Sequence, residues 1–264
     1  MKKEGLLYRV KNAASALFGG TKFTSAVILA GGSGTRVDAD KTKQMIELCG
    51  KPLVVHTLLA FEACDYVNEI VVVAKQDEIA KYEEFRTAYG LRKLTKIVAG
   101  GETRQMSAKN GFDAADERAA YVAIHDGARA LVTPEQIGEV ILAAYAHGAA
   151  IAATRATDTV KYASGGFVAE TLDRNDIWLA QTPQVFRDEI YRAAAYTAEK
   201  DGFAATDDAS LAEHIGIGVY LVDCGAENFK VTVGSDLSRA EILLEERSEE
   251  HTSELQSPTN LVCR

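Results

Sequence analysis

Short apolar runs alternate with segments of helical spacing along most of this chain. The apolar runs are rich in β-branched residues and do not alternate with polar ones, which is typical of strands covered on both faces. They predict strands at 26–29, 69–74, 94–99, 121–125 and 149–154. The intervening segments predict helices at 52–64, 76–89, 106–115 and 134–147. We therefore predict an α/β fold, a mostly parallel twisted sheet with helices on both faces.

Residues 157–176 interrupt this alternation of predicted strands and helices. Two β-rich runs flank Gly165 and Gly166, a pattern that predicts a hairpin. A hairpin inserted into such a sheet has no role in the core, so we expect either an arm that reaches a partner subunit or a lid. Beyond it, the pattern predicts helices at 187–200 and 235–246, a capped helix start at Thr206-Asp207-Asp208, and strands at 218–223 and 229–233.

The two ends of the chain differ from the body at 22–246. Residues 1–21 begin with lysines, but Arg9 and Lys11 break the apolar segment, so this is a weak signal peptide and we expect an N-terminal extension. Residues 247–264 are polar and aperiodic and resemble a translated cloning or adapter sequence. We expect them to be a non-native or disordered tail, and the body to form one domain.

Charge and cysteine usage exclude several classes of protein. The net charge of −9 disfavours non-specific nucleic-acid binding, which relies on basic surface. No uninterrupted apolar run approaches the roughly 18 residues of a membrane span, so we expect no membrane partner. The four cysteines form no C-x-x-C pair, which favours reduced thiols in a cytoplasmic protein.

The loop after the first predicted strand is rich in glycine and basic residues. It contains Gly31, Gly32, Ser33 and Gly34, followed by Arg36, Lys41 and Lys43. Backbone amides at the end of a strand, with cations nearby, suit a polyphosphate. The dinucleotide pattern G-x-G-x-x-G and the Walker pattern are both absent. A phosphate loop of another type is favoured, and a tight loop that needs glycine for steric reasons is the alternative.

Polar residues follow two further predicted strands. Ligands in parallel sheets bind at the carboxyl ends of the strands. The segments at those ends are 31–36, 100–104 and 126–129, and we expect them to converge on one site.

Six motifs occur together in this chain. They are L-A-G-G-S-G-T-R…K-T-K-Q at 29–44, GGETRQMS at 100–107, HDGAR at 125–129, DRNDIWLAQTPQVF at 173–186, TDDAS at 206–210 and ENFKVT at 227–232. In this order and spacing the chain resembles the 2-C-methyl-D-erythritol 4-phosphate cytidylyltransferase family over residues 22–246. The ribitol-5-phosphate cytidylyltransferases are close relatives with similar motifs.

This resemblance implies a Rossmann-like nucleotidyltransferase fold and a reaction. The family transfers the cytidylyl group of CTP to a polyol phosphate and releases pyrophosphate, in non-mevalonate isoprenoid biosynthesis. In-line attack by a phosphate oxygen needs no enzyme nucleophile, and the sequence has no nucleophile motif. Transfer to ribitol 5-phosphate and a nucleotide-binding module without catalysis stay as alternatives.

The resemblance also implies catalytic residues. Arg36 and Lys43 would stabilise the charge of the transition state, unless they are solvated surface cations. Arg174 and Lys230 would hold the methylerythritol phosphate. Because Arg174 lies at the far end of the hairpin, it could serve the site of the other subunit in a homodimer.

The expected substrate-binding residues are Ala30, Gly31, Gly32, Gly34, Gly100, Gly101, Glu102, Ser107, Asp126, Arg129 and Thr206. Helix capping is an alternative role for Ser107 and for Thr206. Arg129 would pair either with Asp126 or with phosphate. We expect Mg²⁺ as cofactor, because its oxygen chemistry suits polyphosphate, with Asp126 as its candidate ligand. His125 is better explained as a core residue.

Overall fold

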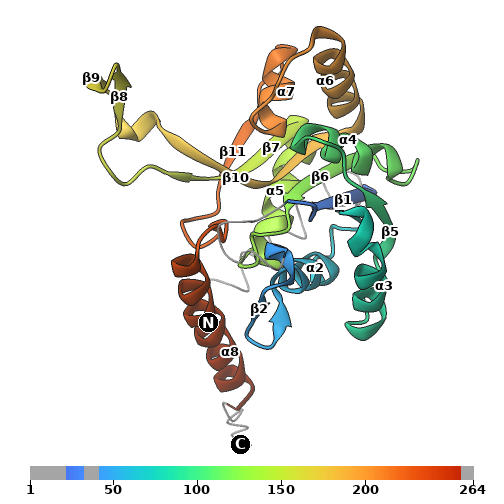
Figure 1. The fold of residues 1–264 in the computed structure, drawn as a ribbon. Coiled ribbons are helices and arrows are strands. Elements are labelled where there is room, and N and C mark those ends of the chain that lie inside the picture. Colours follow the sequence, from blue (N-terminus) through green and yellow to red (C-terminus); the bar gives the residue numbers. More distant parts are fainter. Residues whose placement is uncertain (1–21, 33–41, 257–264) are drawn as a thin grey trace, which may run out of the picture.

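A seven-stranded sheet forms the centre of the computed structural model, which describes residues 22–32 and 42–256 (Figure 1). The order of its strands is β11-β7-β10-β6-β1-β4-β5. Their bounds are Thr24–Leu29 (β1), Glu69–Ala74 (β4), Leu94–Ala99 (β5), Tyr121–Asp126 (β6), Ala149–Arg155 (β7), Trp178–Arg187 (β10) and Tyr220–Asp223 (β11). All neighbours pair in parallel except β10, which is antiparallel to β6 and to β7. The predicted α/β fold is confirmed, whereas β10 was not predicted as a strand.

Helices cover both faces of this sheet. Side chains of β1 alternate between two apolar clusters: Ala26 and Ile28 lie in one, and Val27 and Leu29 lie in the other. Helices α2 (Leu53–Ala63), α3 (Ile79–Ala88) and α5 (Pro134–His147) contribute to the first cluster. Helices α4 (Arg104–Ala114), α6 (Asp188–Asp201) and α7 (Asp208–His214) contribute to the second. Burial on both faces explains why these strands lack a polar alternation.

The connections reverse direction at β1. From β1 the chain proceeds outward through β4 to β5, and it then returns to place β6 on the opposite side of β1. A crevice opens where neighbouring strands lead away in opposite directions, and ligands of open α/β sheets bind there. This topology therefore assigns the site to the carboxyl ends of β1 and β6.

The predicted hairpin is confirmed, and it projects from the body as an arm (Figure 1), although its expected role toward a partner or as a lid stays a prediction. Strands β8 (Lys161–Ser164) and β9 (Phe167–Thr171) pair in an antiparallel sheet of two strands around Gly165 and Gly166. Every residue of both strands is exposed. The short 3-10 helix η3 (Arg174–Asp176) follows and leads into β10.

The C-terminal part differs from the sequence prediction in two ways. Residues 229–233 form no strand, because their backbone bonds go to a loop and to a side chain instead of a ladder: Val231 N donates to the carbonyl of Ala128, and Val233 N to the carboxylate of Asp236. The final helix α8 (Gly234–Gln256) continues ten residues past Glu246. Arg247 donates to the Leu131 carbonyl at 2.8 Å, which ties this extension to the body.

Residues 247–256 are therefore helical and not disordered, whereas the expected non-native origin of this segment stays a prediction. Residues 257–264 and the expected extension at 1–21 lie outside the described residues. A pair of short strands, β2 (Glu47–Leu48) and β3 (Lys51–Pro52), and the 3-10 helices η1 (Lys43–Met45) and η2 (Gln76–Glu78) complete the described elements. Within the described part of the chain, no helix is both long and apolar enough to span a membrane.

Gly111 sets how closely α4 approaches the sheet, and thus where the first turn of α4 lies in the site. A Cβ at this position would come within 2.3 Å of Val27 Cγ1 and 2.6 Å of Val73 Cγ2. We expect Gly111→Leu to lower the free energy of unfolding by about 2 kcal/mol or more in urea denaturation, because overpacking outweighs the gain in helix propensity. Gly218→Leu is the control, since a Cβ at Gly218 meets open space. Equal stability of the two variants would contradict this packing role.

Candidate active site

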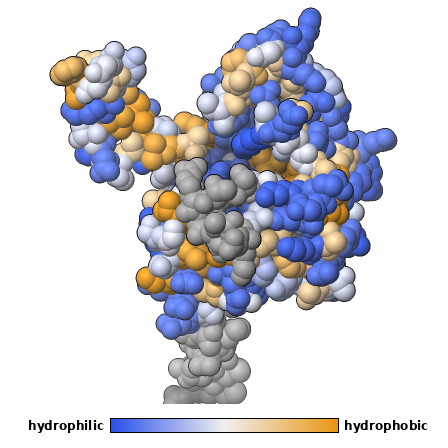
Figure 2. Space-filling model, in the orientation of Figure 1, coloured by the Kyte–Doolittle hydropathy of each residue, from blue (hydrophilic) through white to orange (hydrophobic). Residues whose placement is uncertain are grey.

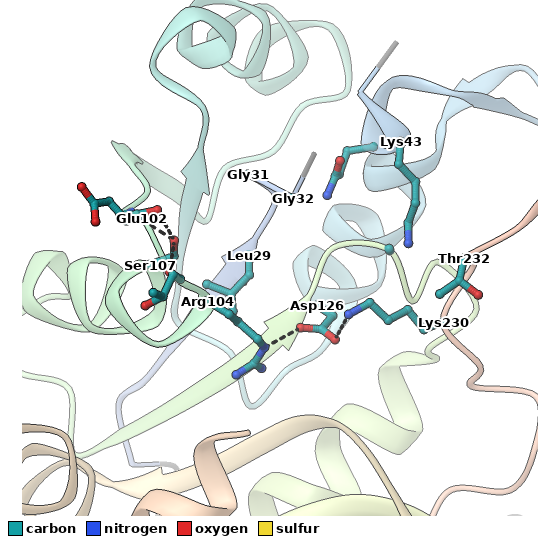
Figure 3. A pocket seen from close by; sticks show the side chains of 14 residues that line it. Leu29, Gly31, Gly32, Lys43, Glu102, Arg104, Ser107, Asp126, Lys230 and Thr232 are labelled. Carbon is teal, nitrogen blue, oxygen red and sulfur yellow. Dashed lines mark hydrogen bonds and ion pairs between the residues drawn. The ribbon is translucent and has the colours of Figure 1, made fainter. Parts of the chain in front are cut away.

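A cleft of about 620 Å³ lies at the carboxyl ends of β1 and β6 (Figure 3). Its size is in the usual range for small-molecule sites. It is lined by Leu29, Gly31, Gly32, Lys43, Gln44, Gly101, Glu102, Thr103, Arg104, Ser107, Asp126, Ala128, Lys230 and Thr232. The three segments expected to converge, after β1, β5 and β6, all contribute. The segment that carries Lys230 joins them from the C-terminal part of the chain.

The glycines after β1 form one wall of the cleft. Gly31 and Gly32 line it, while Ala30 is buried behind them and donates its amide to the Val73 carbonyl at 2.8 Å. The backbone at Gly31 lies against that of Ala74, since an added Cβ would be 3.6 Å from the Ala74 carbonyl carbon. Gly34 and Arg36 lie outside the described residues, so their predicted roles stay predictions.

Lys43 faces the cleft from η1. Lys43 is only 7% exposed, so the alternative prediction that it is a solvated surface cation is wrong. The preceding Thr42 donates its hydroxyl to the buried carboxylate of Glu78, which anchors the start of this short helix next to α3. Gln44 is also buried and lines the cleft, although the sequence analysis did not single it out.

The turn between β5 and α4 supplies a second wall. Gly101 lines the cleft and needs to be glycine, because an added Cβ would lie 2.5 Å from Met106 Cβ. Thr103 caps α4 by accepting from Met106 N at 3.1 Å, so capping is not the role of Ser107. The Ser107 hydroxyl instead accepts from Gly101 N at 3.1 Å and lines the cleft. Glu102 lies at the rim, whereas Gly100 does not line the cleft.

Asp126 ends β6 and is held between two cations (Figure 3). Its Oδ1 accepts from Arg104 Nε at 3.3 Å, and its Oδ2 accepts from Lys230 Nζ at 2.8 Å. Burial by itself raises the pKa of this carboxyl, but the charges of Arg104 and Lys230 outweigh burial and hold the pKa below its usual range. Asp126 is therefore an ionised carboxylate at neutral pH.

Two buried side chains support Asp126 from behind. The Thr182 hydroxyl accepts from Asp126 N at 3.1 Å and bonds to His125 Nδ1 at 3.0 Å. Burial lowers the pKa of His125 to about 3, so this imidazole is neutral at physiological pH. Its ring packs against Phe61, with the ring centroids 4.9 Å apart. His125 is thus a core residue, as predicted, and it helps to place Asp126.

Arg129 forms no direct ion pair with Asp126 among the described residues, and its predicted contact with phosphate stays a prediction. It is half-buried and does not line the cleft, and its Nη1 donates to the Asn228 carbonyl at 2.7 Å. Asp126 contacts Arg104 and Lys230 instead. The Asn228 side chain in turn donates to the Thr182 carbonyl at 2.9 Å. Arg129 therefore ties the segment before Lys230 to the loop that follows β6.

Two further predicted site residues do not line the cleft. Arg174 is on η3 at the base of the arm and donates to the Thr157 carbonyl at 2.9 Å. Thr206 is exposed and precedes α7. It does not cap that helix, because Asp207 is the capping residue, with Ser210 completing a capping box. Capping thus does not explain Thr206, and its substrate role stays a prediction.

Four polar residues of the cleft were not singled out from the sequence: Gln44, Thr103, Arg104 and Thr232. Each lies inside one of the quoted motifs, one or two positions from a residue that was chosen. Arg104 comes directly after the Gly100 to Thr103 turn, and Thr232 is two residues after Lys230. Arg104 could have been found from its position shortly after the predicted strand at 94–99, where ligand-binding residues are expected. Thr232 has no such signal, because its segment is not a strand.

A family comparison matches the part of the chain that forms the cleft. The sequence model of the family described as 2-C-methyl-D-erythritol 4-phosphate cytidylyltransferase matches residues 24–246. The chain belongs to this family. The match spans the whole sheet, the cleft and the arm, and it ends inside α8.

Relatives and solved structures agree over the same region. The cytidylyltransferase of this name from Geobacillus kaustophilus is 41% identical over 226 residues, which cover 85% of this chain and 98% of that protein. The one from Syntrophus aciditrophicus is 43% identical over 221 residues, or 83% and 94% of the two chains. A similar solved structure is the crystal structure of 4-diphosphocytidyl-2C-methyl-D-erythritol synthase from Anaerococcus prevotii, with 28% sequence identity and a TM-score of 0.76. The match covers 85% of this chain and 97% of the Anaerococcus chain.

Proposed function

We propose that this protein transfers the cytidylyl group of CTP to 2-C-methyl-D-erythritol 4-phosphate and releases pyrophosphate, as a step of isoprenoid precursor synthesis. One observation carries the proposal: segments from the quoted motifs converge on a single cleft, in which Arg104 and Lys230 hold the Asp126 carboxylate and Lys43 also lines the wall. Three cations on one cleft of an acidic protein suit the binding of two polyanionic substrates.

The reaction is a displacement at phosphorus. An oxygen of the 4-phosphate attacks the α-phosphorus of CTP, a new P–O bond forms, and the bond to the β-phosphate breaks to release pyrophosphate. Negative charge on the phosphoryl oxygens must be neutralised as the bonds change. Lys43, buried at the glycine wall, meets the triphosphate, and Lys230 meets the phosphate of the polyol.

The donor set at Asp126 suits Mg²⁺ bound mainly by the nucleotide. Mg²⁺ usually takes one or two protein carboxylates, and substrate phosphates and waters complete its shell. Among the described residues no group of three or more His, Cys, Asp or Glu side chains could hold a metal alone. Asp126 is ionised, and each of its oxygens accepts one hydrogen bond and keeps a lone pair. When bound, the cation neutralises charge on the phosphates.

The arm supports a homodimer. Tyr162, Phe167 and Val168 are its exposed apolar residues, and apolar surface gathers along the arm in Figure 2. In the described part of the chain these side chains stay exposed, and such an apolar arm suits a second copy of the protein. Arg174 lies at the base of this arm and outside the cleft of its own chain, so it serves the cleft of the partner.

An assay with the purified protein tests the reaction. We expect pyrophosphate release when CTP, Mg²⁺ and 2-C-methyl-D-erythritol 4-phosphate are supplied together, and none when any of the three is omitted. A parallel reaction with ribitol 5-phosphate separates the two polyol substrates. Turnover of ribitol 5-phosphate alone would contradict the choice of substrate. Binding of CTP without turnover of either polyol would favour a nucleotide-binding module.

A further inference from the structure

Arg104 contacts two carboxylates that belong to different elements. It is the first residue of α4, and its guanidinium reaches into the cleft (Figure 3). Its Nε donates to Asp126 Oδ1 at 3.3 Å, and its Nη1 donates to Asp208 Oδ2 at 2.8 Å. One cation thus joins the end of β6 to the start of α7.

Asp208 is the fixed end of this arrangement. It is the first residue of α7, its side chain is 1% exposed, and Tyr191 on α6 donates to its Oδ1 at 3.1 Å. Burial raises the pKa of Asp208, and Arg104 and Tyr191 act against that rise. In the described part of the chain, Arg104 is the one cation that forms an ion pair with Asp208. A carboxylate buried in this way holds its arginine strongly, because separation would leave an unpaired charge.

The planar guanidinium transmits this anchoring to the cleft. Because the guanidinium is planar and Asp208 holds its Nη1, the orientation of the group directs Nε toward Asp126. Lys230 holds the other oxygen of Asp126 but is less constrained, because its ammonium is a point charge on a flexible stem. The rigid contact with Asp126 is therefore the one made by Arg104.

We propose that Arg104 is a positioning residue, anchored by Asp208, which sets the orientation of the Asp126 carboxylate toward the cation carried by CTP. This inference rests on the proposed function, because it assigns Asp126 to Mg²⁺ of the nucleotide. A purely structural role, in which Arg104 only neutralises Asp208, is the alternative that the experiment must separate.

Three variants of the full chain separate these roles: Arg104→Met, Asp208→Asn and the double variant. Each is measured by thermal unfolding and by calorimetric titration of CTP at a series of Mg²⁺ concentrations. We expect Arg104→Met to lower the unfolding midpoint by about 6 °C or more, because Asp208 loses its cation. The double variant should recover most of this loss, since asparagine needs no counter-charge and can still pair with Tyr191.

The affinity for the metal–nucleotide complex gives the decisive readout. We expect the Mg²⁺ concentration for half-maximal CTP binding to rise about tenfold in Arg104→Met and to stay raised in the double variant, because Asp126 is still unpositioned. Asp208→Asn alone should raise it by a smaller factor, about threefold, since Arg104 keeps its contact with Asp126 but loses the charged anchor that orients it. If the double variant recovers both the midpoint and the Mg²⁺ requirement, Arg104 is only structural and the proposal is overturned.

A further substitution tests the geometry of the contact. Arg104→Lys keeps the charge next to Asp208 but loses the planar guanidinium that contacts both carboxylates. We therefore expect a near-normal unfolding midpoint and a raised Mg²⁺ concentration for half-maximal CTP binding. Wild-type protein that binds CTP with Mg²⁺ but releases no pyrophosphate would contradict the proposed function and not this inference. A wild-type CTP affinity that is independent of Mg²⁺ would overturn the positioning role.

Discussion

Replacing Lys43 with alanine is expected to lower kcat for pyrophosphate release by about 10²-fold or more, because a preorganised charge at the reacting phosphate is lost. Lys43 is buried at the cleft wall, where low dielectric strengthens its interaction with the triphosphate. The effect should appear mainly in kcat if Lys43 acts on charge that develops in the transition state. Steady-state kinetics at saturating CTP measure it.

Controls separate this effect from a general loss of charge or of structure. Lys81→Ala removes an exposed lysine of α3 and should leave kcat within about twofold of the wild type. Lys43→Arg keeps the charge and should recover part of the rate. A Lys43→Ala enzyme with the wild-type kcat would place Lys43 outside the reaction. A rate that is at background in both proteins would favour a binding module without catalysis.

Deleting residues 162–168 at the tip of the arm is expected to convert a dimer into a monomer and to reduce activity strongly. The deletion removes Tyr162, Phe167 and Val168, which are 59%, 81% and 64% exposed. Interfaces depend on a few large apolar side chains of this kind. If Arg174 serves the partner's cleft, as we propose, activity should fall as well. Light scattering measures the mass, and the pyrophosphate assay measures the rate.

A pair of point variants provides the matched control for the deletion. Phe167→Asp places a charge on the arm, whereas Ile242→Asp places one on α8 at a residue that is also exposed, at 57%. We expect Phe167→Asp to weaken the dimer and Ile242→Asp to leave it unchanged. A dimer that persists after the deletion would show that the arm is not the interface.

Most elements of the fold were predictable because their local patterns are strong. The runs at 69–74 and 94–99 match β4 and β5, and the helix at 134–147 matches α5, which has both a proline and a capping box at its start. The predictions failed where local pattern and tertiary context differ. The segment at 229–233 has strand-like composition, but its backbone pairs with a loop and a cap. The segment at 247–256 lacks an apolar stripe and still continues α8.

Periodicity and strand ends are local features, so the amino-acid sequence was enough to predict the fold class and the segments that meet at the cleft. The contacts of each side chain, in contrast, depend on how the chain folds in three dimensions. Lys43 is buried instead of solvated, Arg129 bonds to Asn228, and Asp126 is held by Arg104 and Lys230. Asp126 lies 22 positions from Arg104 and 104 from Lys230, so no local pattern encodes these contacts. They arise because the sheet brings the ends of distant strands to one edge, where charge and burial select the partners.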